Sequence, residues 1–96
     1  MKTSELTGNA LNWAVSHAEG LTGILAPVNY CGKWEHGGPI IEREKIQLKE
    51  NGYGHWFAKK FIKDGWVRGP TPLIAAMRCY VASTLGDDVD APKELP

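Results

Sequence analysis

The chain of 96 residues lacks a long hydrophobic run. Its longest one, Leu73 to Met77, is far shorter than the roughly 20 apolar residues of a membrane-spanning helix. The segment from Met1 to Glu5 also lacks the apolar centre of a signal peptide. We therefore expect a cytoplasmic protein without a membrane partner, in which the two cysteines, Cys31 and Cys79, are reduced.

Net charge is absent too, because 11 basic and 11 acidic residues cancel. The distribution is mildly asymmetric: residues 33–68 carry eight basic and five acidic side chains, whereas residues 87–96 carry four acidic side chains and one lysine. A duplex-DNA binder is expected to show a dense basic stripe, and this sequence has none. We therefore do not expect nucleic acid as a partner.

Motifs for catalysis and for cofactors are missing as well. The glycines form neither a GxxxxGK[ST] phosphate loop nor a GxGxxG turn after a strand. His36, His55, Cys31 and Cys79 have none of the close spacings of zinc ligands. No serine or cysteine stands at a motif spacing from a histidine. The sequence thus predicts no enzyme, no metal site and no cofactor.

What is present, above all, is a strong helix signal after Gly69. Thr71 is a plausible N-cap, Pro72 follows at the first helical position, and Gly86 supplies the C-terminal stop. The residues between them are apolar on nearly every side, which is typical of a helix buried by its neighbours. Because two helices and three short strands would leave part of this helix uncovered, we expect a homo-oligomer.

The remaining periodicities predict a single α+β domain over residues 1–86. Two helices would pack on a short antiparallel sheet in α-β-β-α order. We expect a first helix over Thr3–Ala18, with a start after Gly8 as the alternative, and a brief strand over Leu21–Val28. Residues 87–96 form an acidic, proline-containing tail that we expect to be loosely held.

The middle of the chain is predicted to contain a hairpin. Asn29–Pro39 is interpreted as a loop rich in aromatics and glycine, and Ile40–Leu48 as a strand. Asn51-Gly52 is a strong hairpin signal, after which His55–Ala58 returns as the partner strand, with a possible extension to Lys63.

Three stretches of the chain together resemble a family of small phage and prophage proteins, the NinX-like family. These stretches are Ser4–Gly8 with Leu11–Val15, Gly37–Glu44 and, most specifically, Gly69–Ser83. The resemblance spans nearly the whole chain and implies a phage accessory protein that acts in the cytoplasm of an infected bacterial host. It supplies no catalytic residues to carry over.

Arg78 poses the main functional question, because it interrupts the apolar helix. Helical side chains lean toward the N-terminus, which carries its guanidinium toward Thr71 and Pro72, where unpaired amides are already positive. The capping-box position is Ile74, so no local carboxylate neutralises this end. The anion is then either a ligand or a carboxylate from elsewhere, for which Glu42 and Glu44 are the candidates.

Aromatic residues offer a second element of a ligand site, since planar rings stack on bases. Trp13 and Trp66 are expected in the core, whereas Tyr30, Trp34 and Trp56 are candidate pocket walls. A small basic patch of Lys59, Lys60 and Lys63 is interpreted as a solvated face, with a rim that guides phosphates as the alternative. The predicted ligand-binding residues are therefore Tyr30, Trp34, His36, Gly37, Gly38, Arg43, Trp56, Thr71 and Arg78.

These residues predict a non-catalytic binder of an anionic, ring-bearing, nucleotide-derived small molecule. In a phage accessory protein, such binding fits the sequestration of a host immune signal. Two alternatives remain open. One is a protein-interaction module that inhibits a host enzyme through exposed tryptophans; the other is an accessory factor in replication or recombination.

Overall fold

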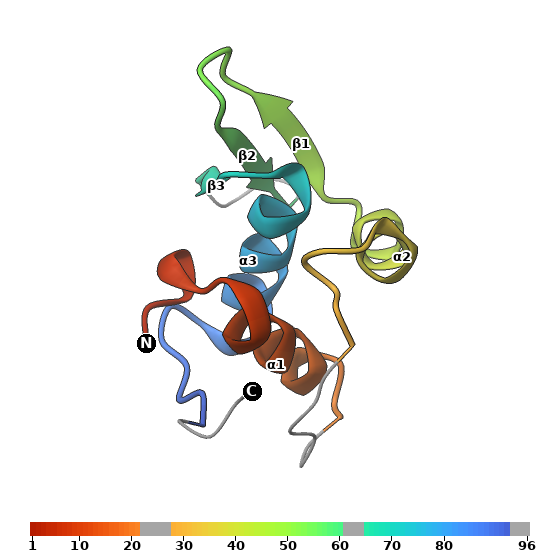
Figure 1. Ribbon diagram of the computed structural model, residues 1–96, viewed down its shortest axis with the longest axis vertical. Helices are drawn as coiled ribbons and strands as arrows, with labels where there is room; N and C mark the ends of the chain where they lie inside the picture. Colours follow the sequence, from red (N-terminus) through yellow and green to blue (C-terminus); the bar gives the residue numbers. More distant parts are fainter. Residues whose placement is uncertain (22–27, 61–64, 93–96) are drawn as a thin grey trace.

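The computed structural model describes residues 1–21, 28–60 and 65–92. Within them the chain forms three α-helices, a short 3-10 helix and a three-stranded sheet (Figure 1). The elements are η1 (Thr3–Glu5), α1 (Gly8–Ala18), α2 (Trp34–Glu44), β1 (Gln47–Glu50), β2 (Trp56–Lys59), β3 (Val67–Gly69) and α3 (Pro72–Leu85). The predicted α+β class is confirmed, but the order contains α2 as an additional helix before the strands.

Helix α3 is the centre of the molecule and was predicted correctly from its local signals. The Thr71 hydroxyl oxygen accepts a hydrogen bond from the Ile74 amide at 3.1 Å, and Pro72 occupies the first turn. Gly86 ends the helix with a positive φ of 94°. Figure 1 shows α3 between the sheet and α1, which explains why half of its residues are buried.

The sheet is antiparallel throughout, in the order β1-β2-β3. Glu50 pairs with Trp56 across the predicted hairpin, which is thereby confirmed. The Asn51 side-chain oxygen accepts hydrogen bonds from the Tyr53 amide at 2.8 Å and the His55 amide at 3.3 Å, and so stabilises the turn. Helix α3 lies against one face of the three strands.

The structure contradicts the predicted loop over Asn29–Pro39 and the predicted strand over Ile40–Leu48. Helix α2 covers much of both segments, and β1 begins only at Gln47, after Lys45 has adopted a left-handed φ of 56°. The sequence Gly37-Gly38-Pro39 is typical of a segment that interrupts a helix. In this structure the helix continues through it, and Gly37 and Ile40, three residues apart, form one buried helical face. Tertiary packing therefore outweighs the poor local helix propensity.

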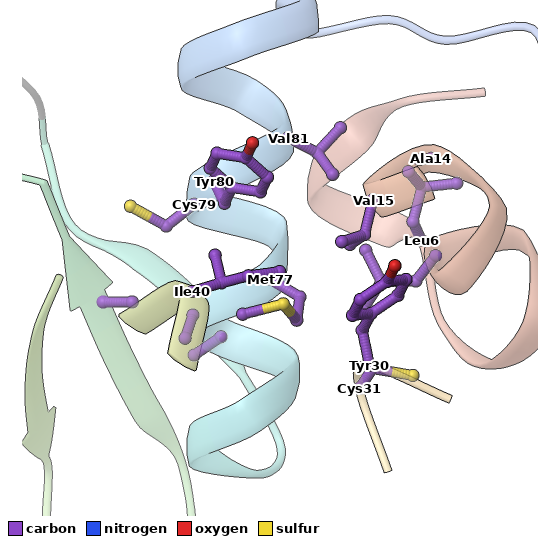
Figure 2. Packing of buried hydrophobic residues seen from close by; sticks show 14 of the residues in the cluster. Leu6, Ala14, Val15, Tyr30, Cys31, Ile40, Met77, Cys79, Tyr80 and Val81 are labelled. Carbon is purple, nitrogen blue, oxygen red and sulfur yellow. The ribbon is translucent and has the colours of Figure 1, made fainter. Parts of the chain in front are cut away.

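The hydrophobic core lies mainly between α1 and α3. Leu6, Leu11, Val15, Met77 and Val81 are completely buried. Figure 2 shows Met77 and Val81 pointing from α3 toward the side chains of the N-terminal segment. Because this core joins elements from both ends of the chain, α3 cannot be held in place by local contacts alone.

Both cysteines are buried thiols. Trp13 packs against the core as expected, whereas Trp66 is 41% exposed, so its predicted core position is wrong. Among the described residues, no helix is long and apolar enough to cross a membrane.

The two ends of the chain lie together. The predicted first helix is divided into η1 and α1, and α1 starts at Gly8, which has a φ of 56°. The Met1 ammonium donates to the Val89 carbonyl at 2.7 Å, and the Thr3 amide donates to the Asp87 carbonyl at 2.8 Å. Val89 is buried. The expectation of a loose tail is therefore wrong for residues 87–89.

Two predicted segments fall largely on residues that the structure does not describe. The possible strand at Leu21–Val28 has only its two end residues within the described ranges. The possible extension of the hairpin strand to Lys63 lies outside the described residues beyond Lys60.

Candidate functional site

A cleft opens beside Arg78, between the N-terminal segment, β3 and the second half of α3. Its volume is about 350 Å³. The lining contains both positive and negative side chains together with two hydroxyls, and its members are Lys2, Thr3, Ser4, Val67, Arg78, Ala82, Asp87 and Asp88. Hydrogen bonds between the two ends of the chain hold this lining together, since the Thr3 hydroxyl donates to the Gly86 carbonyl at 2.7 Å.

Two main-chain carbonyls hold the guanidinium of Arg78. Its Nε donates to the Leu6 carbonyl at 2.7 Å, and Nη1 donates to the Arg68 carbonyl at 2.9 Å. A guanidinium has five N–H donors, so three are left without a partner among the described residues. The guanidinium therefore bonds to the carbonyls of Leu6, which follows η1, and of Arg68 on β3, rather than to the expected Thr71 and Pro72.

Arg78 forms no ion pair with a carboxylate among the described residues. The predicted alternative of a Glu42 or Glu44 partner is also wrong, since both residues lie on α2 and Glu44 pairs with Arg43 and Lys60. Burial, followed by the nearby charge of Arg68, lowers the pKa of Arg78 from its ordinary value. An arginine nevertheless stays protonated at neutral pH. The result is a partly desolvated cation without a carboxylate partner among the described residues, an arrangement that an anion would stabilise.

The structure does not gather the other predicted ligand-binding residues around this cleft. Tyr30 is buried in the core, Trp56 packs against the core, and the Thr71 side chain caps α3. Trp34 is 54% exposed at the start of α2. Three more of the predicted ligand-binding residues lie on α2. They are His36, whose Nε2 lies 3.9 Å from Oε2 of Glu35, and Gly37 and Gly38, which lie in the helix interior.

Arg43 also lies elsewhere, in a network that ties three helices together. Its Nη1 and Nη2 donate to the two carboxylate oxygens of Glu19 at 3.0 and 2.6 Å, and its Nε donates to Glu44 at 2.8 Å. Lys60 donates to the other oxygen of Glu44 at 2.8 Å, while the Tyr80 hydroxyl donates to Glu19. The donors of Arg43 lower the pKa of the Glu19 carboxyl. Arg43 is therefore a structural residue in this fold.

This network makes stability sensitive to alkaline pH. Burial and the hydrogen bond to Glu19 raise the pKa of Tyr80 to about 12. The pKa of a tyrosine in an unfolded chain is about 10, so the native state holds this proton more tightly. The free energy of unfolding should thus decline as pH rises from about 10 through about 12. Urea unfolding of the wild type and of Tyr80→Phe across this range should show the advantage of the wild type shrinking; a constant difference would contradict this assignment.

A second surface of interest is the side of the sheet turned away from α3. Leu48, Ala58 and Val67 are paired across the strands and contribute to the core. Because successive residues of a strand point to opposite faces, the neighbouring paired set lies on the other side. That set consists of Lys49, Phe57 and Arg68.

Two further residues complete this second surface. Lys59 follows Phe57 by two positions and so shares its face. The ammonium nitrogens of Lys49 and Lys59 lie 5.3 and 5.4 Å from the centre of the Trp66 ring. We call the surface formed by Lys49, Phe57, Lys59, Trp66 and Arg68 the open sheet face. The alternation of residues along β1 and β2 is the sequence signal that could have indicated the part of the open sheet face formed by Lys49, Phe57 and Lys59. The part formed by Trp66 and Arg68 depends on how β3 pairs with β2.

No group of three or more histidine, cysteine, aspartate or glutamate side chains in the described parts of the chain is arranged to hold a metal ion. A search of curated proteins finds no match to the chain. A comparison with protein-family models matches residues 25–84 to the family described as bacteriophage P22, NinX. The matched segment includes α2, the sheet and nearly all of α3. Because it covers more than half of the sequence, the chain belongs to the phage NinX family.

Proposed function

We propose that this phage accessory protein binds a small anionic, nucleotide-like molecule in the Arg78 cleft without turning it over. One observation carries the proposal: the Arg78 guanidinium borders an open cleft with three N–H donors left and no carboxylate partner among the described residues. Phosphate and carboxylate groups match the planar fork of an arginine. The two carbonyl acceptors fix the orientation of this fork before a ligand arrives.

The other lining residues limit the chemistry of the ligand. Lys2 adds a second positive charge, whereas Asp87 and Asp88 add two acceptors that would repel a ligand of uniform negative charge. The cleft therefore suits a molecule that carries both an acidic group and hydroxyl or amino donors. A nucleoside phosphate has this pattern. The volume of about 350 Å³ is near the lower end of small-molecule sites, which span about 300–1,000 Å³.

No aromatic side chain lines the cleft among the described residues. The ring of the ligand would then be recognised through its polar edge, and the stacking expected from Tyr30, Trp34 and Trp56 plays no part. In an infected cell, binding without turnover would lower the free concentration of a nucleotide-derived signal. We therefore propose sequestration of such a signal in the host cytoplasm as the role of this protein.

Titration calorimetry with nucleoside monophosphates, cyclic dinucleotides, cyclic oligonucleotides and ADP-ribose derivatives tests the proposal. We expect one of these classes to bind, and Lys2→Glu to weaken that binding by about tenfold, equivalent to about 1.4 kcal/mol. Lys2 is exposed, so its replacement should leave the fold intact. Lys33→Glu is the matched control, because Lys33 is also exposed and does not line the cleft.

Arg78→Lys should reduce the affinity further, since a lysine cannot bind both carbonyls and also present a fork to the ligand. Its melting temperature would show whether the fold survives the loss of those two bonds. Absence of heat with every compound would overturn the proposal, and so would equal affinities of the wild type and Lys2→Glu.

A further inference from the structure

The open sheet face combines positive charge with accessible aromatic rings. Lys49, Lys59 and Arg68 carry three positive charges around Phe57 and Trp66, and no described residue of this face is acidic. Trp66 is 41% exposed and Phe57 is partly exposed. The near-zero net charge of the whole chain therefore conceals a local excess of positive charge.

The positive charges of this face are not neutralised within the described structure. Lys49, Lys59 and Arg68 form no ion pair with a described carboxylate, in contrast to Lys60, which pairs with Glu44. The two lysines instead lie against the Trp66 ring. Such cation–π contacts hold the ammonium groups beside the ring, where they are available to an anion that approaches it.

We propose that the open sheet face binds single-stranded nucleic acid. Unpaired bases would stack on Trp66 and Phe57, and the phosphates between them would contact Lys49, Lys59 and Arg68. A sheet that presents rings and cations on one accessible face suits unpaired bases, because stacking needs a base whose flat side is free. A base-paired duplex offers the same phosphates but no free flat sides. This inference goes beyond the proposed function, since it concerns another surface and a polymeric ligand.

Fluorescence anisotropy of a labelled oligothymidylate of about 12 nucleotides, within the usual range of site sizes, provides the test. Trp66→Ala should weaken binding by about 5- to 150-fold, the usual loss for removing one stacked base. Trp34→Ala is the matched control, because Trp34 is also an exposed tryptophan and lies on α2. It should bind like the wild type. Neutralising Lys49, Lys59 and Arg68 together should leave little measurable binding.

Salt dependence gives a second readout. Three phosphate contacts predict that the logarithm of the binding constant falls with the logarithm of salt concentration with a slope of about −2. Lys49→Gln should make this slope shallower by about 0.7, whereas Lys33→Gln should not change it.

The proposal would be overturned by undetectable binding, by equal losses in Trp66→Ala and Trp34→Ala, or by equally tight binding of duplex DNA or polyglutamate. Equally tight binding of duplex DNA or polyglutamate would show that this face binds polyanions in general. Calorimetric titration of Trp66→Ala with the same nucleoside monophosphates, cyclic nucleotides and ADP-ribose derivatives keeps the two proposals apart, because this variant should bind them as the wild type does.

Discussion

Gly69→Ala is expected to lower the free energy of unfolding by about 3 kcal/mol, at the upper end of ordinary overpacking effects. A methyl group at this position would lie 2.5 Å from the Ala75 amide nitrogen and 2.8 Å from the Ala75 Cα. Both atoms belong to the backbone of the first turns of α3, so no side chain can rotate to make room. Relief requires β3 and α3 to separate, which would also disturb the Arg68 carbonyl that holds Arg78. Urea unfolding followed by circular dichroism measures the loss.

Gly65→Ala is the control for this substitution. A Cβ at Gly65 would meet no atom within 4 Å. An alanine there should leave the stability unchanged or raise it by up to about 1 kcal/mol, because it restricts the unfolded chain. Similar losses in the two variants would show that β3 and α3 do not approach as closely as described.

Gly37→Ala is expected to destabilise the protein by about 1–3 kcal/mol, although alanine favours helices. The added Cβ would clash with the Tyr30 carbonyl oxygen and would lie 2.7 Å from Leu73 Cδ2. The leucine can move, but the carbonyl is fixed by the segment that leads into α2. The same urea experiment applies.

The adjacent glycine should respond in the opposite direction. A Cβ at Gly38 would find its nearest contact at 3.7 Å, on the Trp34 ring. Gly38→Ala should therefore raise stability by up to about 1 kcal/mol through helix propensity alone. If both alanines were stabilising, α2 would not pack against Tyr30 and Leu73 in solution.

These two glycines also show why α2 was not predicted. All signals for α3 are local: a capping threonine, a proline at the first position, apolar spacing and a terminal glycine. In α2 the local signals point away from a helix, because Gly37, Gly38 and Pro39 stand in its centre. What favours the helix is the close approach of Gly37 to Tyr30 and Leu73, and the latter is 36 residues away in the sequence.

The candidate site, like the fold, could be predicted from the sequence only in part. That Arg78 lacks a local carboxylate followed from the sequence, and the structure places it beside a cleft without such a partner among the described residues. Its direction did not follow, because the acceptors belong to Leu6 and Arg68. The open sheet face was missed because Trp66 was assigned to the core, and because the register of β3 against β2 cannot be read from a three-residue strand.

Native mass spectrometry most directly tests whether the Arg78 cleft is a ligand site. The purified protein would be incubated with a small-molecule extract of the bacterial host, desalted and compared with Lys2→Glu treated in the same way. We predict that the wild type retains one phosphate- or carboxylate-bearing molecule per chain and that Lys2→Glu retains markedly less. A bare polypeptide mass for both proteins would contradict the account, as would an adduct of equal abundance in both.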